Sequence, residues 1–283
     1  MIVITGATGQ LGRLVIRSLL EHVPAANIVA AVRNPARADD LAALGVEVRE
    51  ADYARPAMLA AAFRGAQKLL LISSSEVGQR VAQHRNVIEA AQSVGVGLVA
   101  YTSLLHADRS PLALALEHRE TEALLRASGV PHVLLRNGWY TENYLASVPA
   151  ALQHGAFIGC AGQGCIASAA RADYAAAAAA VLLAPDQAGR VYELAGDEAY
   201  TLAELAAELS RQTGKPTPYV DLPEAEYKAA LLGAGLPEPL AGVIADSDTG
   251  ASRGGLFDDG HQLSRLIGRP TTALGALMAA ALR

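Results

Sequence analysis

The sequence has little cysteine, few aromatic residues and no long apolar run. Its two cysteines, Cys160 and Cys165, cannot form a disulfide framework in a chain of 283 residues. Their C-x4-C spacing has no second pair to complete a zinc site, so we predict free thiols, no metal and a reducing compartment. The longest apolar run, from Tyr174 to Ala184, is far shorter than the roughly 20 residues that span a bilayer. An apolar stretch follows Met1 at once, so we expect no targeting segment, no membrane insertion and a cytoplasmic location.

Charged residues are also scarce and form no cluster of one sign. They make up 18% of the chain with a net charge of −5, and the basic residues are scattered, which argues against nucleic acid as a partner. Hydrophobic residues make up 52%, which is typical of a globular protein with a substantial core. The sequence leaves the oligomeric state open.

The first half of the chain alternates short apolar runs with longer helical stretches. The apolar runs show no alternation with polar residues, so we expect strands that are buried on both faces of a parallel sheet. Alternating strands and helices predict an α/β protein with a Rossmann-type doubly wound parallel sheet. The expected strands are 27–32, 46–49, 68–72, 97–102 and 132–135 after a first strand at 2–5, and the expected helices are 11–21, 56–63, 77–94 and 112–128. Ser110 and Pro111 resemble the N-cap and first residue of the last helix.

The pattern changes near residue 140, where helical stretches begin to dominate. We therefore predict an NADP-binding Rossmann domain over 1–140 and a smaller, mostly helical substrate lobe over 141–283, with some elements returning to the main sheet. Thr201 and Glu204 have the spacing of a capping box, and 191–194 reads as a further strand. Short helices with turns near Gly233, Gly235 and Pro237 are expected in the last 60 or so residues.

The strongest motif is a glycine loop between the first strand and the first helix. Its form is G-x-x-G-x-x-G, which suits a tight turn, close approach to a pyrophosphate, and close packing of helix on strand. The N–H groups at the start of the helix then face the phosphates. The alternative is a turn that serves packing alone. The predicted cofactor-binding residues here are Gly6, Ala7, Thr8, Gly9, Gln10, Leu11 and Gly12.

The end of the second strand indicates which dinucleotide is bound. NAD-specific sites place an acidic residue there, whereas no acid occurs between Glu21 and Asp39. Arg33 ends the strand instead, and a guanidinium suits the 2′-phosphate of NADPH, although a solvated surface arginine is the alternative. We predict NADPH as cofactor. Asp52, after the third strand, is a weaker candidate for contact with the adenine because a turn aspartate is an equal explanation.

Three serines follow the fourth strand. Ser73, Ser74 and Ser75 lie where ligands bind in this fold, so we predict that they contact the nicotinamide half of the cofactor. One of them could cap the next helix while the others face the ligand cleft.

A second polar and aromatic segment follows the sixth strand. It holds the single tryptophan and suits a flat ligand, although large aromatics also anchor lobes to each other. The predicted substrate-binding residues are Asn137, Gly138, Trp139, Tyr140, Thr141, Glu142 and Asn143. His84, His106 and His118 have no obvious partner in the sequence and are expected to be structural.

These motifs together resemble the NmrA-like branch of the atypical short-chain dehydrogenases. The resemblance covers nearly the whole chain and rests on G-A-T-G-Q-L-G, V-R-N-P and L-L-R-N-G-W-Y-x-E-N-Y. The strings L-L-L-I-S-S-S-E-V-G-Q-R and Y-T-S-L-L-H-A-D are similar to the bacterial type 2 NAD(P)H:quinone oxidoreductases within that branch. The resemblance implies reduction of quinones to hydroquinones by direct two-electron hydride transfer from NADPH. It also implies a cofactor contact at Ser168 and a catalytic hydroxyl at Ser103.

The chain departs from ordinary short-chain dehydrogenases at their Tyr-x-x-x-Lys pair. Leu114 occupies the tyrosine position and His118 the lysine position in our alignment. Quinone reduction suffers less from this loss than carbonyl reduction, because the ring gains aromaticity and water can protonate the product. The missing pair is also compatible with a second function, a non-catalytic NADP(H) sensor that acts on a protein partner.

Overall fold

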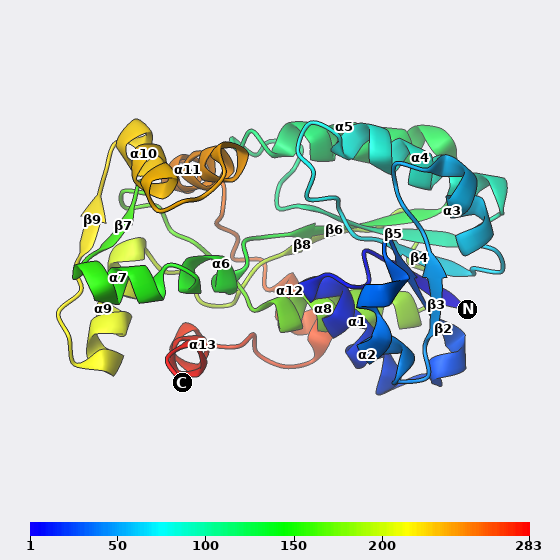
Figure 1. Ribbon diagram of the computed structural model, residues 1–283, viewed down its shortest axis with the longest axis horizontal. Helices are drawn as coiled ribbons and strands as arrows, with labels where there is room; N and C mark the ends of the chain where they lie inside the picture. The colour runs from blue at the N-terminus through cyan, green and yellow to red at the C-terminus, as the bar shows by residue number, and fades with distance from the viewer. The chain divides into compact units, whose positions relative to one another are not determined.

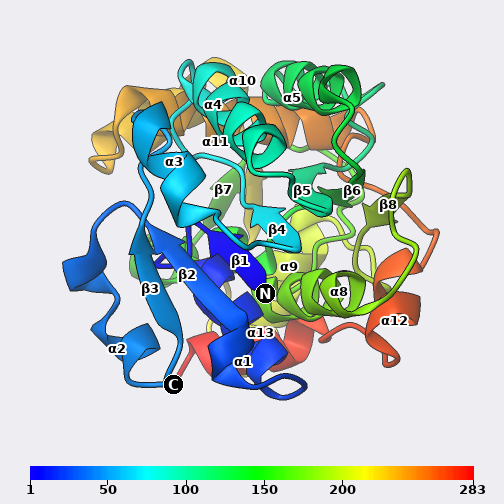
Figure 2. The same cartoon turned by 90° about the vertical axis from the view of Figure 1, so that its right-hand side faces the viewer.

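A seven-stranded sheet forms the centre of the computed structural model, which describes all 283 residues. Its strand order is β3-β2-β1-β4-β5-β6-β8, which can be followed in Figure 2, where all of these strands are labelled; Figure 1 shows the same sheet from another side. The strands are β1 Ile2–Thr5, β2 Ile28–Val32, β3 Glu47–Glu50, β4 Lys68–Leu71, β5 Leu98–Leu104, β6 His132–Asn137 and β8 Val191–Leu194. From β3 to β6 every neighbouring pair is parallel, which confirms the predicted doubly wound sheet.

The direction of winding reverses at β1. The chain adds β2 and then β3 on one side of β1, and then places β4 on the other side. Ile4 of β1 thus pairs with Ala30 of β2 and with Leu70 of β4. Because strand order reverses here, the loops after β1, β2 and β4 meet at one carboxyl edge of the sheet, where ligands bind in this class of fold.

Helices cover both faces of this sheet. Figure 2 shows α3, α4 and α5 on one face and α1 with α8 on the other. The bounds are α1 Gln10–Leu20, α2 Asp39–Ala42, α3 Pro56–Ala62, α4 Arg80–Ser93, α5 Ala115–Ser128 and α8 Arg171–Leu183, with short 3-10 turns at Ala25–Asn27 and Pro35–Arg37. The apolar run of the sequence is therefore α8, and α8 packs along α1. Between sheet and helices lies a core that includes Val29, Phe63, Leu69 and Tyr101, all without exposed surface.

The chain divides into two compact units that interleave along the sequence. The first comprises 1–104, 117–137 and 171–192, and the second comprises 105–116, 138–170 and 193–283. The second unit contains α6 Thr141–Leu145, α7 Val148–His154, α9 Leu202–Thr213, α10 Glu224–Gly233, α11 Glu238–Ser252, α12 Gln262–Ile267 and α13 Leu274–Ala281. It also holds a two-stranded parallel sheet of β7 Phe157–Gly159 and β9 Tyr219–Asp221. The predicted division into domains at residue 140 stays a prediction.

Several local predictions are confirmed. Thr201 and Glu204 form the expected capping box at the start of α9. Residues 191–194 form β8, which follows β6 in the main sheet.

None of the helices combines the length and the apolar character that a membrane span requires.

The predicted start of α5 at Ser110 is wrong, because α5 begins at Ala115. The intervening segment is held by tertiary contacts: Asp246 accepts a hydrogen bond from the backbone N–H of Ala113 at 2.9 Å. Leu112 packs so closely that a Cβ on Gly250 would lie 2.5 Å from its Cδ1. These contacts override the local capping signal.

A further local prediction is wrong. The strand β3 is not buried on both faces, since its residues are half-buried or exposed at the edge of the sheet, with Glu47 and Arg49 paired at 2.8 Å. The alternative that one of the three serines caps α4 does not apply, because the N-cap of α4 is Gln79, without a side-chain hydrogen bond.

Candidate cofactor and substrate site

The glycine loop forms the turn that its sequence predicts. Gly6 directly follows β1 with φ +57°, a conformation that L side chains rarely adopt. The N–H of Gly9 donates to the carbonyl of Gly6 at 2.9 Å and closes the turn. A Cβ on Gly12 would lie 2.6 Å from that same carbonyl oxygen, so only glycine lets α1 approach the loop this closely.

The start of α1 fits the pyrophosphate of a dinucleotide. Gly9 is the N-cap, has extended backbone angles and offers no side chain to the free N–H groups of the first turn. The first turn also contains no acidic residue. A Cβ on Gly9 would meet only the Gly6 carbonyl, at 3.1 Å, so the rest of the space before it is open. Uncapped N–H groups and the helix dipole together favour an anion at this position.

Arg13 joins the glycine loop to the segment after β2. Its guanidinium donates to the carbonyl of Thr8 and, at 2.8 and 2.9 Å, to the two carboxylate oxygens of Asp40. It also donates to the carbonyl of Arg37 at 2.8 Å. Sequence reasoning missed this residue. Its place one residue after the last loop glycine was the available signal, but its partners Arg37 and Asp40 lie more than 20 residues away.

Arg33 lies at the carboxyl end of β2, as predicted, but it has an unexpected acidic neighbour. Its side chain is 69% exposed and pairs with Glu76, with 2.6 Å between Nη1 and Oε1. Glu76 lies five residues beyond β4, so the search for an acid near Arg33 along the sequence could not find it. Asp52, by contrast, accepts a hydrogen bond from the N–H of Ala54 at 2.9 Å, which is the turn role that the sequence left open.

The three serines differ in what their polar groups contact. Ser74 is buried and fully engaged: its N–H donates to His84 Nε2 at 2.9 Å, its hydroxyl donates to Gln83 at 2.5 Å, and its carbonyl accepts from Arg80 at 2.7 Å. Ser73 is half-buried, and its N–H donates to Thr102 Oγ1 at 2.8 Å. Ser75 is exposed. Ser74 therefore holds the loop in place, whereas Ser73 and Ser75 have side chains that are accessible to a ligand.

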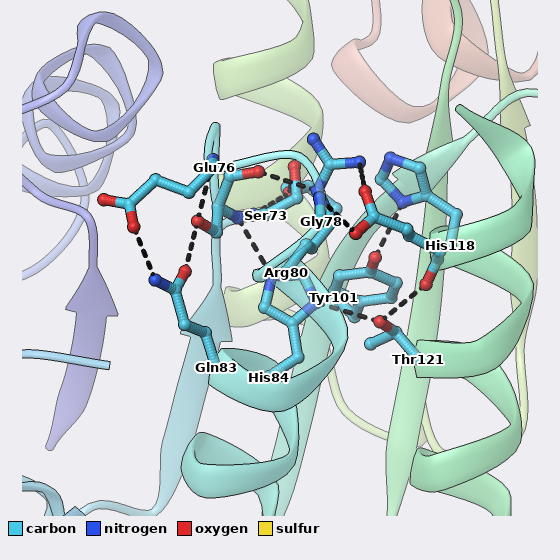
Figure 3. A network of polar contacts seen from close by, with 12 residues as sticks. Ser73, Glu76, Gly78, Arg80, Gln83, His84, Tyr101, His118 and Thr121 are labelled. Carbon is cyan, nitrogen blue, oxygen red and sulfur yellow. Dashed lines mark hydrogen bonds and ion pairs between the residues drawn. The ribbon is translucent and has the colours of Figure 1, made fainter. Parts of the chain in front are cut away.

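The buried histidines beneath this loop are neutral. His84 accepts from Ser74 at Nε2, so its proton is on Nδ1, which donates to Thr121 Oγ1 at 2.9 Å (Figure 3). Burial, with the nearby Arg80, lowers the pKa of His84 to about 3. Burial likewise holds the pKa of His118 well below its usual value, and its Nδ1 is 2.7 Å from the Tyr101 hydroxyl. The expectation that His118 is structural agrees with these contacts, since a buried neutral imidazole is no replacement for a charged lysine.

Ser103, the predicted catalytic hydroxyl, is in β5 and only 5% exposed. Its hydroxyl donates to Glu122 Oε1 at 2.7 Å. Arg136 binds the same carboxylate through Nε at 3.0 Å and Nη2 at 2.9 Å. The Ser103 hydroxyl thus donates its proton to a carboxylate that is part of a buried ion pair with Arg136. A catalytic role for Ser103 stays a prediction.

The predicted substrate segment begins at the end of β6 with Asn137 and continues into α6. Within the second unit, the N–H of Gly138 donates to the carbonyl of Leu194 at 2.7 Å, and the N–H of Thr141 donates to the carbonyl of Ala169 at 3.0 Å. Trp139, Tyr140 and Glu142 are half-buried, and Asn143 is exposed. The segment is therefore pinned by its backbone and presents four large or polar side chains with accessible surface.

Ser168 lies next to this segment. Its hydroxyl is 2.7 Å from Thr141 Oγ1 and 2.5 Å from the Tyr200 hydroxyl, and all three side chains are buried. Burial raises the pKa of Tyr200 to about 12. The structure brings the predicted residues Thr141 and Ser168 together, and it adds Tyr200, which the sequence analysis did not single out.

A family comparison agrees with this arrangement. The model of the NmrA-like family matches residues 1–274. The chain belongs to the NmrA-like family. Quinone oxidoreductase 2 of Escherichia coli (strain K12) is 65% identical over 274 residues, which are 97% of this chain and 96% of that protein.

Two solved structures are also similar to this chain over its length. The crystal structure of the NADPH-dependent quinone oxidoreductase QOR2 from Escherichia coli, complexed with NADPH, has a TM-score of 0.98 and 62% sequence identity, with all of both chains covered. The triphenylmethane reductase of Citrobacter sp., complexed with NADP(H), has a TM-score of 0.95 and 38% identity over 99% of this chain and all of that one. The predicted family and fold are confirmed.

Proposed function

We propose that this protein reduces quinones to hydroquinones with NADPH. The observation that carries the proposal is similarity over the whole chain, at 65% identity, to a protein named quinone oxidoreductase 2. The glycine loop supports it, since its geometry fits a dinucleotide and the similar structure was solved with NADPH. In the overall reaction, NADPH, one proton and the quinone give NADP⁺ and the hydroquinone.

The bound cofactor supplies a hydride from its nicotinamide ring, and the protein supplies position. The N–H groups at the start of α1 would hold the pyrophosphate, and Arg33 would contact the 2′-phosphate. Ser73 and Ser75 would contact the nicotinamide half, on a loop that hydrogen bonds of Ser74 to His84, Gln83 and Arg80 hold in place. The segment 137–143, with its half-buried aromatic rings, would contact the planar acceptor.

No charged acid is required at the position of the usual lysine. Leu114 has no ionisable group and His118 is buried and neutral, so neither delivers a proton at neutral pH. A quinone tolerates this because the hydroquinone anion is a weak base that water can protonate. Orientation of the two rings accounts for the rate in this scheme. A carbonyl substrate, whose alkoxide needs an acid, should react poorly.

The test is a steady-state assay that follows loss of the near-ultraviolet absorbance of NADPH. Simple benzoquinones and naphthoquinones should be reduced, whereas aliphatic ketones should not. Product analysis should find one hydroquinone for each NADPH oxidised. A protein that binds NADPH tightly and reduces no quinone or other planar acceptor would instead be the sensor that the missing Tyr-x-x-x-Lys pair also allows.

A further inference from the structure

A carboxylate lies beside the guanidinium that the proposed function assigns to the 2′-phosphate. Glu76 Oε1 is 2.6 Å from Arg33 Nη1, and the two side chains are 45% and 69% exposed. An exposed ion pair of this kind contributes little to stability, commonly below about 1 kcal/mol. Stabilisation of the fold therefore does not account for the Arg33–Glu76 ion pair. An anion that binds a guanidinium more strongly can compete with Glu76 for Arg33.

The pair joins two loops that flank the glycine loop. Arg33 directly follows β2, and Glu76 follows β4; β1, which carries the glycine loop, lies between these two strands. Glu76 is thus at the carboxyl edge of the sheet where the adenosine half of a dinucleotide leaves the loop after β1. The negative charge of Glu76 is therefore close enough to interact with any ligand group that Arg33 binds.

Glu76 is also held from its other side. Its Oε2 accepts a hydrogen bond from Gln83 Nε2 at 2.7 Å, and its backbone N–H donates to Ser74 Oγ at 3.1 Å. Figure 3 shows Gln83 reaching up from α4 to the Glu76 carboxylate and to the loop. These contacts, with Gln83 first and Arg33 second, lower the pKa of Glu76, so the group is ionised at neutral pH. The carboxylate is anchored on α4 and does not depend on Arg33 for its position.

We infer that Glu76 determines how strongly the protein discriminates between NADPH and NADH. The anchored carboxylate neutralises Arg33 and repels a 2′-phosphate, so it limits the gain that Arg33 provides for NADPH. The same carboxylate accepts a hydrogen bond from a 2′-hydroxyl, which is the role of the acid in NAD-specific sites. The inference rests on the proposed function, because that function assigns Arg33 to the 2′-phosphate.

Removal of the charge should therefore sharpen the preference for NADPH. Glu76→Gln keeps the size of the side chain and an acceptor for Gln83, but frees Arg33. We expect affinity for a 2′-phosphate to rise by about tenfold, the order that one charged contact contributes, and affinity for a 2′-hydroxyl to fall or stay equal.

Calorimetric titration can test this without any turnover. The probes are adenosine 2′,5′-bisphosphate, which carries the 2′-phosphate, and adenosine 5′-diphosphate, which carries a 2′-hydroxyl. Glu47→Gln is the matched control: it removes one negative charge from an exposed ion pair, that with Arg49, at the amino end of β3 in the same sheet. Arg33→Ala tests the phosphate contact on which the inference depends.

A rise in the affinity ratio of the two probes in Glu76→Gln, but not in Glu47→Gln, supports the inference. An unchanged ratio, or a rise of equal size in the control, overturns it. A lower ratio also overturns it, because Glu76 would then orient Arg33 for the phosphate. If Arg33→Ala discriminates as well as the wild type, the Arg33 assignment itself is wrong, whereas failure of quinone turnover would leave the binding result intact.

Discussion

Among single side chains, Arg33 decides the choice of cofactor in our proposal. We predict that Arg33→Asp weakens NADPH binding by about 2 kcal/mol or more, because a charge-assisted contact is lost and a second carboxylate joins Glu76. NADH binding should change much less. Dissociation constants for both cofactors from fluorescence titration check this. Arg64→Asp, a similar charge reversal on an exposed loop before β4, serves as control. Equal losses of affinity for NADPH and NADH would show that Arg33 does not bind the 2′-phosphate.

His118 is the side chain for which structure and sequence give the same expectation. It is 4% exposed, its pKa is lowered by burial, and it contacts Tyr101. We predict that His118→Ala changes quinone turnover by less than about tenfold, which corresponds to about 1.4 kcal/mol of barrier. Trp139→Ala or Asn143→Ala should cost more, through looser orientation of the acceptor.

The measurement for His118 is the dependence of kcat on pH. Wild type and variant should give the same profile, since a neutral histidine contributes no titration near neutral pH. His118→Gln keeps a polar group against Tyr101 and covers the case in which alanine destabilises the core. Loss of turnover in a folded His118→Gln variant that still binds NADPH would identify the histidine as a proton donor and refute our mechanism.

The glycine loop and the helix that follows it work as one element. Gly9 and Gly12 have different tasks there: a Cβ on Gly9 meets only the Gly6 carbonyl, at 3.1 Å, whereas a Cβ on Gly12 overlaps the backbone of both Gly6 and Ala7. We predict that Gly9→Val abolishes NADPH binding and leaves the fold intact, because its side chain fills the space before the first turn. Gly12→Val should lower the thermal midpoint as well.

Circular dichroism and cofactor titration on the same samples separate these effects. Gly78→Ala is a suitable control for the change in a glycine, since nothing lies within 4 Å of a Cβ there, although its φ of +86° makes some strain unavoidable. A folded Gly9→Val protein with normal NADPH affinity would show that the loop serves packing alone.

For the molecule as a whole, unfolding should depend on pH through Asp248. This side chain in α11 is 2% exposed; it accepts from the Cys160 N–H at 3.1 Å and from the Tyr144 hydroxyl at 3.4 Å. Burial raises its pKa to about 6. Because the folded pKa lies above that of the unfolded chain, the neutral form favours folding, and this contribution is lost as pH rises from about 4 through 6.

We therefore predict that Asp248→Asn stabilises the protein at neutral pH, by about 3 kcal/mol, and has little effect near pH 4. An amide can accept from Cys160 and donate to Tyr144, so both contacts survive. Denaturant unfolding at several pH values measures the difference, with the exposed Asp259→Asn as control. A stability gain that does not change with pH would contradict the raised pKa.

Much of the fold could be predicted because its signals are local. Uniformly apolar runs mark the buried parallel strands, and the glycine spacing marks the tight turn between β1 and α1, since each depends on residues adjacent in the chain. The start of α5 could not be predicted from the sequence, because residues of α11 and its C-terminal turn, more than 130 positions away, contact Leu112 and Ala113. The exposure of edge strand β3 could also have been predicted, since residues 46–49 read Val-Glu-Val-Arg and such alternation of apolar and polar residues is typical of a strand with one exposed face.

The candidate site divides in the same way. The sequence by itself determined the glycine loop between β1 and α1, Arg33 at the end of β2 and the absence of the Tyr-x-x-x-Lys pair, because each is a matter of residue identity at a place along one strand or helix. Only the tertiary structure decided that Glu76 faces Arg33, that Ser103 donates to Glu122, and that Asp248 is buried without a cation. These partners come from separate elements, and the charge and hydrogen-bonding state of a group depend on what the fold places within a few ångströms of it.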